Sequence, residues 1–118
     1  TIRAMLEMSG IQVEIDNQLN VASIPPSQQS TISMILLEAA TNIIKHAQAK
    51  KSWFSLVKKD EKIVLDIQDD GCGFQKLTGR ELHSIRERLS ALSGSIEILS
   101  SQDPTWIRIE LPYGGKEA

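Results

Sequence analysis

Four polar side chains stand at helical spacing inside the otherwise apolar stretch from Leu36 to Lys50. They are Glu38, Asn42, Lys45 and His46. On a helix of about 3.6 residues per turn they fall on one side, roughly opposite the apolar residues. Asn42 and Glu38 carry oxygens of the kind that Mg²⁺ binds directly or through water, and Lys45 is a point charge suited to phosphate. A solvated helix face is the simpler explanation of the pattern, and a histidine hydrogen-bonded at the helix end explains His46 equally well.

A tight glycine turn follows, with the sequence DDGCGF from Asp69 to Phe74. Asp69 ends an alternating segment, and Gly71 and Gly73 lack the Cβ atoms that would keep a ligand away from the backbone. A D-x-G-x-G turn by itself is most often only a turn. Behind an E-x-x-x-N-x-x-K-H helix and two strands it is a more specific signal, and it predicts that both motifs belong to one ligand site.

The spacing of apolar residues predicts the elements that position these motifs. A helix is expected over Thr1–Ser9, a long one from the N-cap Ser27 to Ala47, and another from about Arg80 to Ser93, with Gly94 behind it. Alternating residues predict five strands: Ile11–Asp16, Trp53–Lys58, Ile63–Gln68, Ser95–Ser100 and Thr105–Leu111. The predicted fold class is α+β, a two-layer sandwich with helices packed on one face of a mixed, mostly antiparallel sheet.

Composition narrows the classes of protein to which the chain can belong. The 118 residues suit one domain with a real core, and 24% of them are charged, with a formal net charge of −2. Scattered basic residues argue against nucleic-acid binding, and the single cysteine, Cys72, excludes an internal disulfide or a cysteine-built metal site. No apolar run of membrane-spanning length and no secretory signal is visible, so the chain is expected to be cytoplasmic, without direct membrane contact.

The polar helix residues resemble the N box of the ATP-binding fold shared by histidine kinases, type II topoisomerases and heat-shock chaperones, the Bergerat fold. DDGCGF resembles its first glycine box. IRERLSALSGSIEILS and TWIRIELP are similar to the end of the kinase domain in sensor histidine kinases of the nitrate/nitrite and desaturase type. The resemblance runs from about Gly10 to Pro112. It implies an ATP-binding catalytic domain at 11–113, the end of a preceding helix or linker at 1–10, and a tail at 114–118.

The resemblance also implies roles for single residues. Asn42 would be the Mg²⁺ ligand. Asp69 would accept a hydrogen bond from the exocyclic amine of adenine, and Thr105 would assist through water, although an ordinary strand threonine is an equally good explanation of Thr105. Catalytic roles are implied for Glu38, Lys45 and His46. Further nucleotide contacts are implied for Gly71, Gly73, Gly79 and Leu82.

The second glycine box departs from the subfamily pattern, which is G-x-G-L-x-G-M before R-E-R. The sequence here is TGRELHSIRERL, in which Gly79 and Leu82 fit, while Glu81 and Ser84 stand where glycines are expected. Backbone amides at a helix N-terminus hold phosphates in this box, so a carboxylate there would lie close to the triphosphate and disfavour it. Three basic residues could offset that charge: Arg80, Arg86 and Arg88. The departure bears on nucleotide affinity and leaves the fold assignment unchanged.

The predicted function is that of a sensor histidine kinase catalytic domain. It would bind Mg·ATP and donate the γ-phosphate to a histidine on a separate dimerisation domain, chiefly by positioning and electrostatic stabilisation. Neither His46 nor His83 is expected to be the acceptor. The expected partners are the parent protein's own dimerisation domain and a response regulator, and the parent is expected to be a homodimer. One alternative is a degenerate, non-catalytic interaction module of the same fold, which Glu81 and Ser84 favour. Another is a serine kinase that acts on a regulatory protein and shares the fold, which the RERL sequence disfavours.

Overall fold

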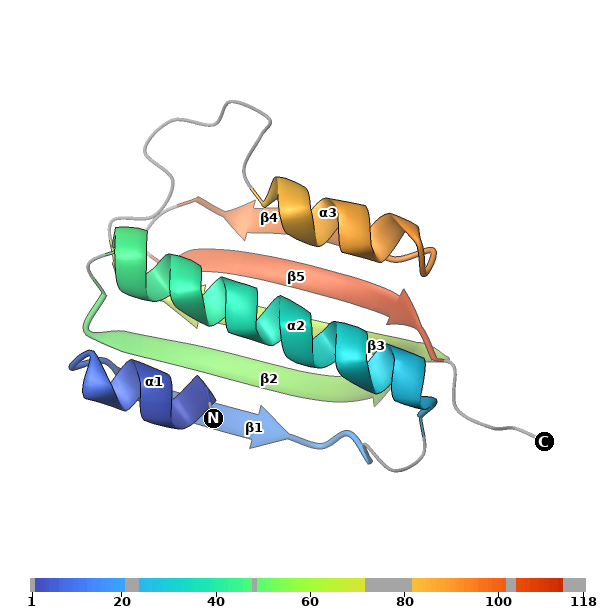
Figure 1. The fold of residues 1–118 in the computed structure, drawn as a ribbon, viewed down its shortest axis with the longest axis horizontal. Helices are drawn as coiled ribbons and strands as arrows, with labels where there is room; N and C mark the ends of the chain where they lie inside the picture. The colour runs from blue at the N-terminus through green and yellow to red at the C-terminus, as the bar shows by residue number, and fades with distance from the viewer. Residues whose placement is uncertain (1, 21–23, 48, 72–81, 102–103, 114–118) are drawn as a thin grey trace.

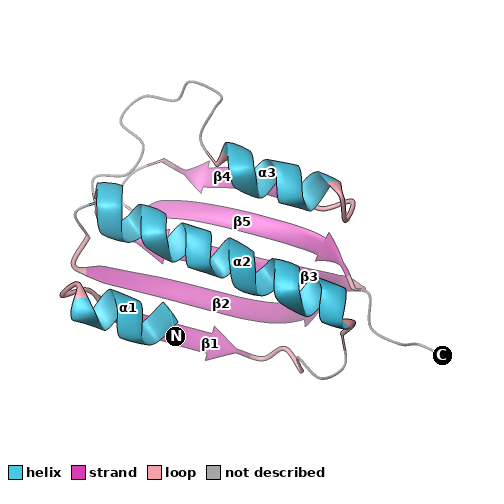
Figure 2. Cartoon of the chain, viewed as in Figure 1, coloured by secondary structure: helices cyan, strands magenta, loops and turns pink. Residues whose placement is uncertain are grey.

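The described strands form one five-stranded sheet, and the helices lie on one of its faces, as Figure 1 shows for the computed structural model of the chain. The structure describes residues 2–20, 24–47, 49–71, 82–101 and 104–113. Figure 2 shows the same two layers, with the helices in front of the strands. This arrangement confirms the predicted two-layer α+β sandwich.

The sheet has the strand order β1 (Gln12–Asn17), β2 (Lys51–Lys59), β3 (Lys62–Asp69), β5 (Thr105–Pro112) and β4 (Ser95–Ser100). Strands β1 and β2 are parallel, and the other described neighbours are antiparallel. Between β2 and β3, Asp60 and Glu61 have positive φ angles of 52° and 65°, which match the twist of a tight hairpin. The sheet is therefore mixed and mostly antiparallel, as predicted.

Three α-helices of the described residues pack against this sheet: α1 (Ile2–Met8), α2 (Pro26–Asn42) and α3 (His83–Ser90). A five-residue π-helix, η2 (Ile43–Ala47), continues α2 to the point where the sequence predicted the end of the helix. In Figure 1, α2 runs along the middle of the sheet, with α1 on the β1 side and α3 on the β4 side. Within the described residues, no helix is both long and apolar enough to cross a membrane.

The start of α2 differs from the prediction. Pro25 is the N-cap residue, with an extended backbone (φ −62°, ψ 149°) and no side-chain capping hydrogen bond. A residue before a proline is kept out of the helical region, whereas Pro26 itself fits the first helical position, where its missing N–H has no partner to lose. Ser27 as the N-cap is therefore wrong, because the two prolines set the boundary by steric exclusion.

The end of α3 also differs from the prediction. The helix ends at Ser90, and the residue with a left-handed backbone is Ser93, with φ 58°. Gly94 is needed for another reason, since a Cβ atom there would lie 2.6 Å from Leu111 Cδ2 and 2.9 Å from the Glu110 carbonyl oxygen. A glycine at this position therefore lets the chain pass close to β5. The helix begins at His83, after Leu82 with a left-handed backbone (φ 65°), so the predicted start near Arg80 is too early.

The core lies between the helices and the sheet. The large apolar side chains that are at most 1% exposed come from all three α-helices and from β3 and β5: Leu6, Ile35, Ile63, Leu65, Ile85, Leu89, Ile109 and Leu111. Burial of each such side chain contributes about 1.5–3 kcal/mol. This layer holds α2 against the strands and so fixes where its polar residues stand.

Candidate functional site

The helix-facing positions of the sheet change from apolar to polar at one end. Inside the sheet they form apolar rows across β2, β3 and β5: Phe54–Ile67–Ile107 and Leu56–Leu65–Ile109. The end row is Ser52–Asp69–Thr105, in which Asp69 is the register partner of both neighbours. These three residues, here called the polar row, are 0%, 5% and 4% exposed. The sheet thus buries a carboxylate and two hydroxyl groups where β3 ends and where β2 and β5 begin.

The Asp69 carboxylate is buried and only partly satisfied. Burial raises its pKa, which the hydrogen bond from the Gly71 N–H to Oδ1 (2.8 Å) lowers in part and the charge of Asp70 raises further. In the part of the chain that the structure describes, the carboxylate accepts this one hydrogen bond. Because burying a carboxylate is costly unless it is hydrogen-bonded, its second oxygen is well placed to accept a hydrogen bond from a ligand.

Asp70 has the opposite environment. It is exposed, and its Oδ1 accepts hydrogen bonds from the N–H groups of Lys50 and Lys51 at 2.8 and 3.0 Å. Desolvation would raise the pKa of Asp70, but the N–H groups of Lys51 and Lys50 outweigh it, and the pKa is lowered. The Asp70 N–H bonds to the Lys51 carbonyl oxygen at 3.1 Å. Asp70 therefore fastens the end of β3 to the start of β2 and holds the backbone that carries Asp69.

Thr105 completes the polar row on the β5 side. Its hydroxyl lies 3.5 Å from the carbonyl oxygen of Ser101, beyond the usual range of an O–H···O hydrogen bond. The hydroxyl is thus weakly held and can turn toward a water or a ligand. Its place directly across from Asp69 is what the water-mediated role implied by the resemblance requires, and that role stays a prediction.

The polar helix residues approach the same end of the sheet. Glu38 and Asn42 lie on α2 and are partly buried, and Lys45 lies on η2 and is exposed. η2 ends three residues before Lys50, whose N–H is bonded to Asp70 beside the polar row. His46 belongs to η2, and its side chain is outside the description. The structure therefore brings the two sequence motifs to one end of the molecule, where Figure 1 shows the last turn of α2 above the ends of the strands.

Glu38 is not isolated on its helix. The Nε atom of Arg88, on α3, lies 3.8 Å from Glu38 Oε1, and Arg88 Nη1 lies 3.6 Å from the sulfur of Met34. Arg88 Nε is buried and has no hydrogen-bond partner within the described residues. From the sequence, Arg88 was one of three arginines that could offset the charge of Glu81. The structure instead places it against the carboxylate of Glu38.

The glycine boxes are described only in part. The Gly71 N–H bonds to Asp69, and Leu82 precedes α3 with φ 65° and packs partly buried against the core. Ser84 is exposed near the start of α3. Three predicted residues lie outside the described ranges: Gly73, Gly79 and Glu81.

Ser52 is the site residue that sequence reasoning missed. The predicted strand began at Trp53, whereas β2 begins at Lys51 and buries Ser52, Phe54 and Leu56 in alternation. The signal was available, because Ser52 is in phase with the two apolar residues that face the core. A serine that begins a series of alternating buried residues would have indicated a polar position facing the core.

The two tryptophans pack on the other face of the sheet. Trp53 and Trp106 are both register partners of Gln68, one residue out of phase with the polar row. Lys51 Nζ lies 5.3 Å from the Trp53 ring centroid, and the Arg108 guanidinium carbon lies 5.4 Å from that of Trp106. They therefore lie on the face of the sheet that the helices leave open, and they do not face Asp69.

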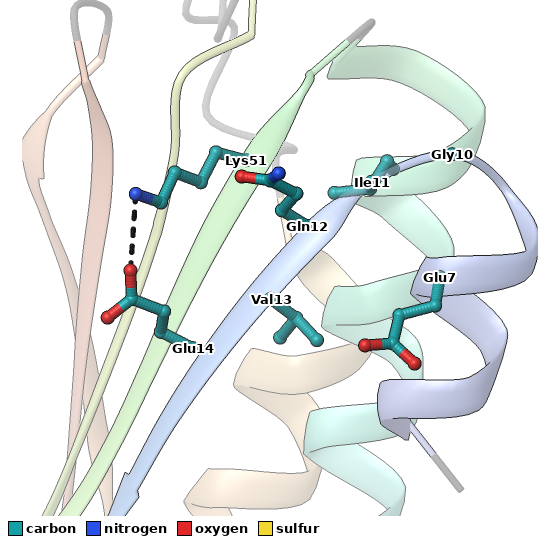
Figure 3. A pocket seen from close by; sticks show the side chains of 7 residues that line it. All are labelled: Glu7, Gly10, Ile11, Gln12, Val13, Glu14 and Lys51. Atoms are coloured by element: carbon teal, nitrogen blue, oxygen red, sulfur yellow. Dashed lines mark ion pairs between the residues drawn. The ribbon is translucent and has the colours of Figure 1, made fainter.

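A separate hollow of about 390 Å³ lies at the β1 edge. Figure 3 shows the side chains that line it. Lys51 Nζ lies 3.1 Å from Glu14 Oε2 on one side of β1, and Glu7 of α1 lies on the other. Since its lysine is paired and two carboxylates line it, this hollow does not suit a nucleotide triphosphate.

A metal ion at the polar end would find few ligands among the described residues. Within the described residues, no group of three or more His, Cys, Asp or Glu side chains is placed to hold one. Asn42, partly buried on the last turn of α2, supplies one neutral oxygen. One protein ligand completed by phosphate oxygens and water is a common way to bind Mg²⁺, so the residues fit an ion that arrives with a nucleotide.

Comparison with known proteins places these features in a wider group. Residues 27–115 match the family model described as histidine kinase-, DNA gyrase B- and HSP90-like ATPase. The chain is 34% identical over 110 residues to the signal transduction histidine-protein kinase/phosphatase UhpB of Salmonella typhimurium, covering 91% of this chain and 22% of that protein. It is 36% identical to the sensor histidine kinase YxjM of Bacillus subtilis, covering 93% of this chain and 27% of that protein.

Solved structures show the same fold. The blue-light activated histidine kinase of Erythrobacter litoralis superposes with a TM-score of 0.80 at 15% identity, over 96% of this chain and 39% of that one. The histidine kinase AdeS of Acinetobacter baumannii gives a TM-score of 0.76 at 16% identity, over 97% of this chain and 60% of that one. The chain spans only 22–30% of the first curated relatives it matches.

Proposed function

The chain belongs to the histidine kinase-, DNA gyrase B- and HSP90-like ATPase family, whose shared domain binds ATP, and we propose that it is the catalytic domain of a sensor histidine kinase. In this role it binds Mg·ATP and donates the γ-phosphate to a histidine on a separate dimerisation domain. The observation that carries the proposal is the buried Asp69 carboxylate, which ends β3 opposite Thr105 and has an acceptor oxygen to spare.

The polar row is the proposed binding site of the adenine base. Asp69 accepts a hydrogen bond from the exocyclic amine, and Thr105 is close enough in register to contribute through water. A buried acceptor discriminates strongly, because a base that cannot donate to it leaves the carboxylate unpaired. The apolar row behind it, with Ile67 in its centre, is proposed to pack against the flat base.

The phosphates are proposed to lie toward the last turn of α2. Asn42 would hold Mg²⁺, which when bound neutralises the charge of the triphosphate, and Lys45 would contact phosphate oxygens. Glu38 is proposed to orient the attacking imidazole of the acceptor histidine, in a position steadied by Arg88. His46 and the glycines of the two boxes keep the roles that the resemblance implies. These residues act by positioning and electrostatics, as expected where phosphoryl transfer needs little covalent help.

The acceptor is proposed to lie on another domain. His83 is exposed at the start of α3, where its Nε2 atom lies 3.6 Å from Glu87 Oε2 on the same helix. The similar proteins are several times longer than this chain, which leaves room for a dimerisation domain in the parent protein. A homodimeric parent, a response regulator that receives the phosphate, and a cytoplasmic location are parts of the same proposal.

A non-catalytic module of the same fold is the second candidate. Glu81 and Ser84, in place of glycines, favour it. The variant Glu81→Gly separates the two, since in a catalytic domain it should raise affinity for Mg·ATP more than affinity for adenosine. In a module that has lost nucleotide binding, the unmodified chain would bind neither ligand measurably.

Phosphotransfer in trans tests the leading proposal. The chain is incubated with γ-labelled ATP and Mg²⁺, alone and with the dimerisation domain of its parent protein. Acid-labile label is expected on the added domain and not on this chain. Label on this chain alone would show that His46 or His83 is an acceptor, and absence of label in both reactions, with ATP bound, would favour the non-catalytic candidate.

A further inference from the structure

We propose that Ser52 is a base-selecting residue, and that its hydroxyl oxygen and the Asp69 carboxylate together accept both N–H groups of an exocyclic amine. The inference rests on the proposed function and extends it to a residue that neither the sequence motifs nor the resemblance indicated. Ser52 is completely buried on β2, and its register partner on β3 is Asp69.

The setting of Ser52 calls for an explanation. The next two helix-facing positions of the same strand, Phe54 and Leu56, are apolar core residues. A hydroxyl in such a place lowers stability unless it is hydrogen-bonded, and an alanine or valine would serve the core better. Ser52 Oγ donates to the Gln12 carbonyl oxygen at 3.2 Å, on the neighbouring strand. This bond satisfies the proton of the hydroxyl.

The lone pairs of the Ser52 hydroxyl oxygen remain available to accept a hydrogen bond. A serine hydroxyl has one proton and two lone pairs, and the proton of Ser52 is directed at Gln12. Asp69, when ionised, has only acceptors. Ser52 and Asp69 therefore both have acceptor capacity on neighbouring strands. The group that suits two adjacent acceptors is one with two divergent N–H donors.

The spacing of the two residues fits an amine. An –NH₂ group that donates two hydrogen bonds of about 2.9 Å at about 120° to each other needs acceptors about 5 Å apart. Directly opposite residues on antiparallel strands have Cβ atoms about 4.5–5.5 Å apart. The register Ser52–Asp69 thus places the Cβ atoms of the two acceptor side chains within reach of a single exocyclic amine.

The inference predicts a coupling between Ser52 and the amine of the ligand. Ser52→Ala should weaken ATP binding about three- to tenfold, the value of one neutral hydrogen bond in a buried site. The same variant should bind purine riboside triphosphate, which lacks the exocyclic amine, as well as the parent does. Ser55→Ala is the matched control, because Ser55 lies on β2 but on the opposite face, where it pairs with Asp66.

The experiment is a calorimetric titration of the parent, Ser52→Ala and Ser55→Ala with both nucleotides. A loss confined to ATP and to Ser52→Ala supports the inference. Equal losses for both nucleotides would overturn it and assign Ser52 to the support of β1, and no loss for either would overturn it as well. If Ser52→Ala does not fold, Ser52→Cys, with a poor acceptor of similar size, carries the same expectation. A parent that binds neither nucleotide would instead refute the proposed function.

Discussion

Asp69 and Thr105 stand directly opposite each other on the antiparallel strands β3 and β5, and both side chains are buried on the helix-covered face of the sheet. Burying the Asp69 carboxylate there contributes less to the stability of the fold than burying the isoleucines of the neighbouring row, Ile67 and Ile107. Positions of this kind are retained where a ligand completes their hydrogen bonds, and they are the positions at which function and stability oppose each other.

Asp69→Asn tests that opposition. Loss of a hydrogen bond to a charged group should weaken ATP and ADP alike by about 10- to 100-fold, because the base contact is common to both. The apo variant should melt at a higher temperature than the parent at neutral pH, because it no longer buries a charge. Titration calorimetry and thermal melting on the same preparation measure both effects. A variant that binds ADP normally would remove Asp69 from the base site.

The stability effect of Asp69 should depend on pH in a defined sense. Its pKa in the folded state is raised above the ordinary value of 3.8, so the folded state holds the proton more tightly than the unfolded state. The stability of the parent should therefore fall as pH rises from about 3.8 through the raised pKa, relative to Asp69→Asn. Melting temperatures at pH 3 to 7 follow this. A difference between the two proteins that is the same at pH 3 and pH 7 would contradict it.

Asp70 should behave in the opposite way. Its lowered pKa means that the ionised form stabilises the fold, and this contribution is complete above 3.8 and lost as pH falls through the lowered pKa. Asp70→Ala should reduce stability by about 1 kcal/mol at neutral pH, a modest value because the group is exposed. Asp70→Asn should cost less, since an amide oxygen still accepts from Lys50 and Lys51. Chemical denaturation measures the free energy of unfolding of both variants. An Asp70→Ala protein as stable as the parent would show that the hydrogen bonds from Lys50 and Lys51 to Asp70 contribute little to stability.

Asn42→Ala should abolish the Mg²⁺ dependence of ATP binding. The side chain is only partly buried, so its removal should leave the melting temperature within a few degrees of the parent. Affinity for ATP is compared with Mg²⁺ and with EDTA, and adenosine serves as the control ligand because it carries no phosphate. A variant that melts far below the parent would identify Asn42 as a structural residue and remove it from the site.

Arg88→Gln separates positioning from binding. The Arg88–Glu38 pair is partly exposed, so it is worth at most about 1 kcal/mol of stability. Misplacing the Glu38 carboxylate should nevertheless slow phosphotransfer by about tenfold or more, with the Kd for ATP changed less than about twofold. Glu87→Gln, on the same helix and exposed, is the matched control. Loss of ATP affinity in proportion to the rate would show instead that Arg88 contacts the nucleotide.

Periodicity in the sequence was sufficient for the architecture. Alternation in segments such as Ile63–Gln68 predicted the strands, because one face of the sheet is buried and the other is open. It was not sufficient for the boundaries. Pro25 rather than Ser27 is the N-cap, because the following proline keeps Pro25 out of the helical region. Gly94 is required by its close contact with Leu111, and a local sequence pattern does not reveal such a distant contact.

Some residues of the candidate site could likewise be predicted from the sequence, and others could not. Asp69 and Asn42 stand out in the sequence because their motifs are contiguous. Ser52 and Arg88 do not stand out, because the proposed role of each depends on a partner on another element. Ser52 pairs in register with Asp69, and Arg88 lies beside Glu38. Such pairings depend on strand register and helix packing, which single-sequence patterns do not specify.

The most direct test of the central claim is a calorimetric titration of the unmodified chain with ATP and with GTP, both in excess Mg²⁺. Adenine presents an amine where guanine presents a carbonyl oxygen, and the buried Asp69 carboxylate can accept from the first and not from the second. The expected result is saturable binding of ATP with affinity at least about tenfold higher than that of GTP. Equal affinity for the two nucleotides, or no binding of ATP, would contradict the assignment of the polar row as an adenine site.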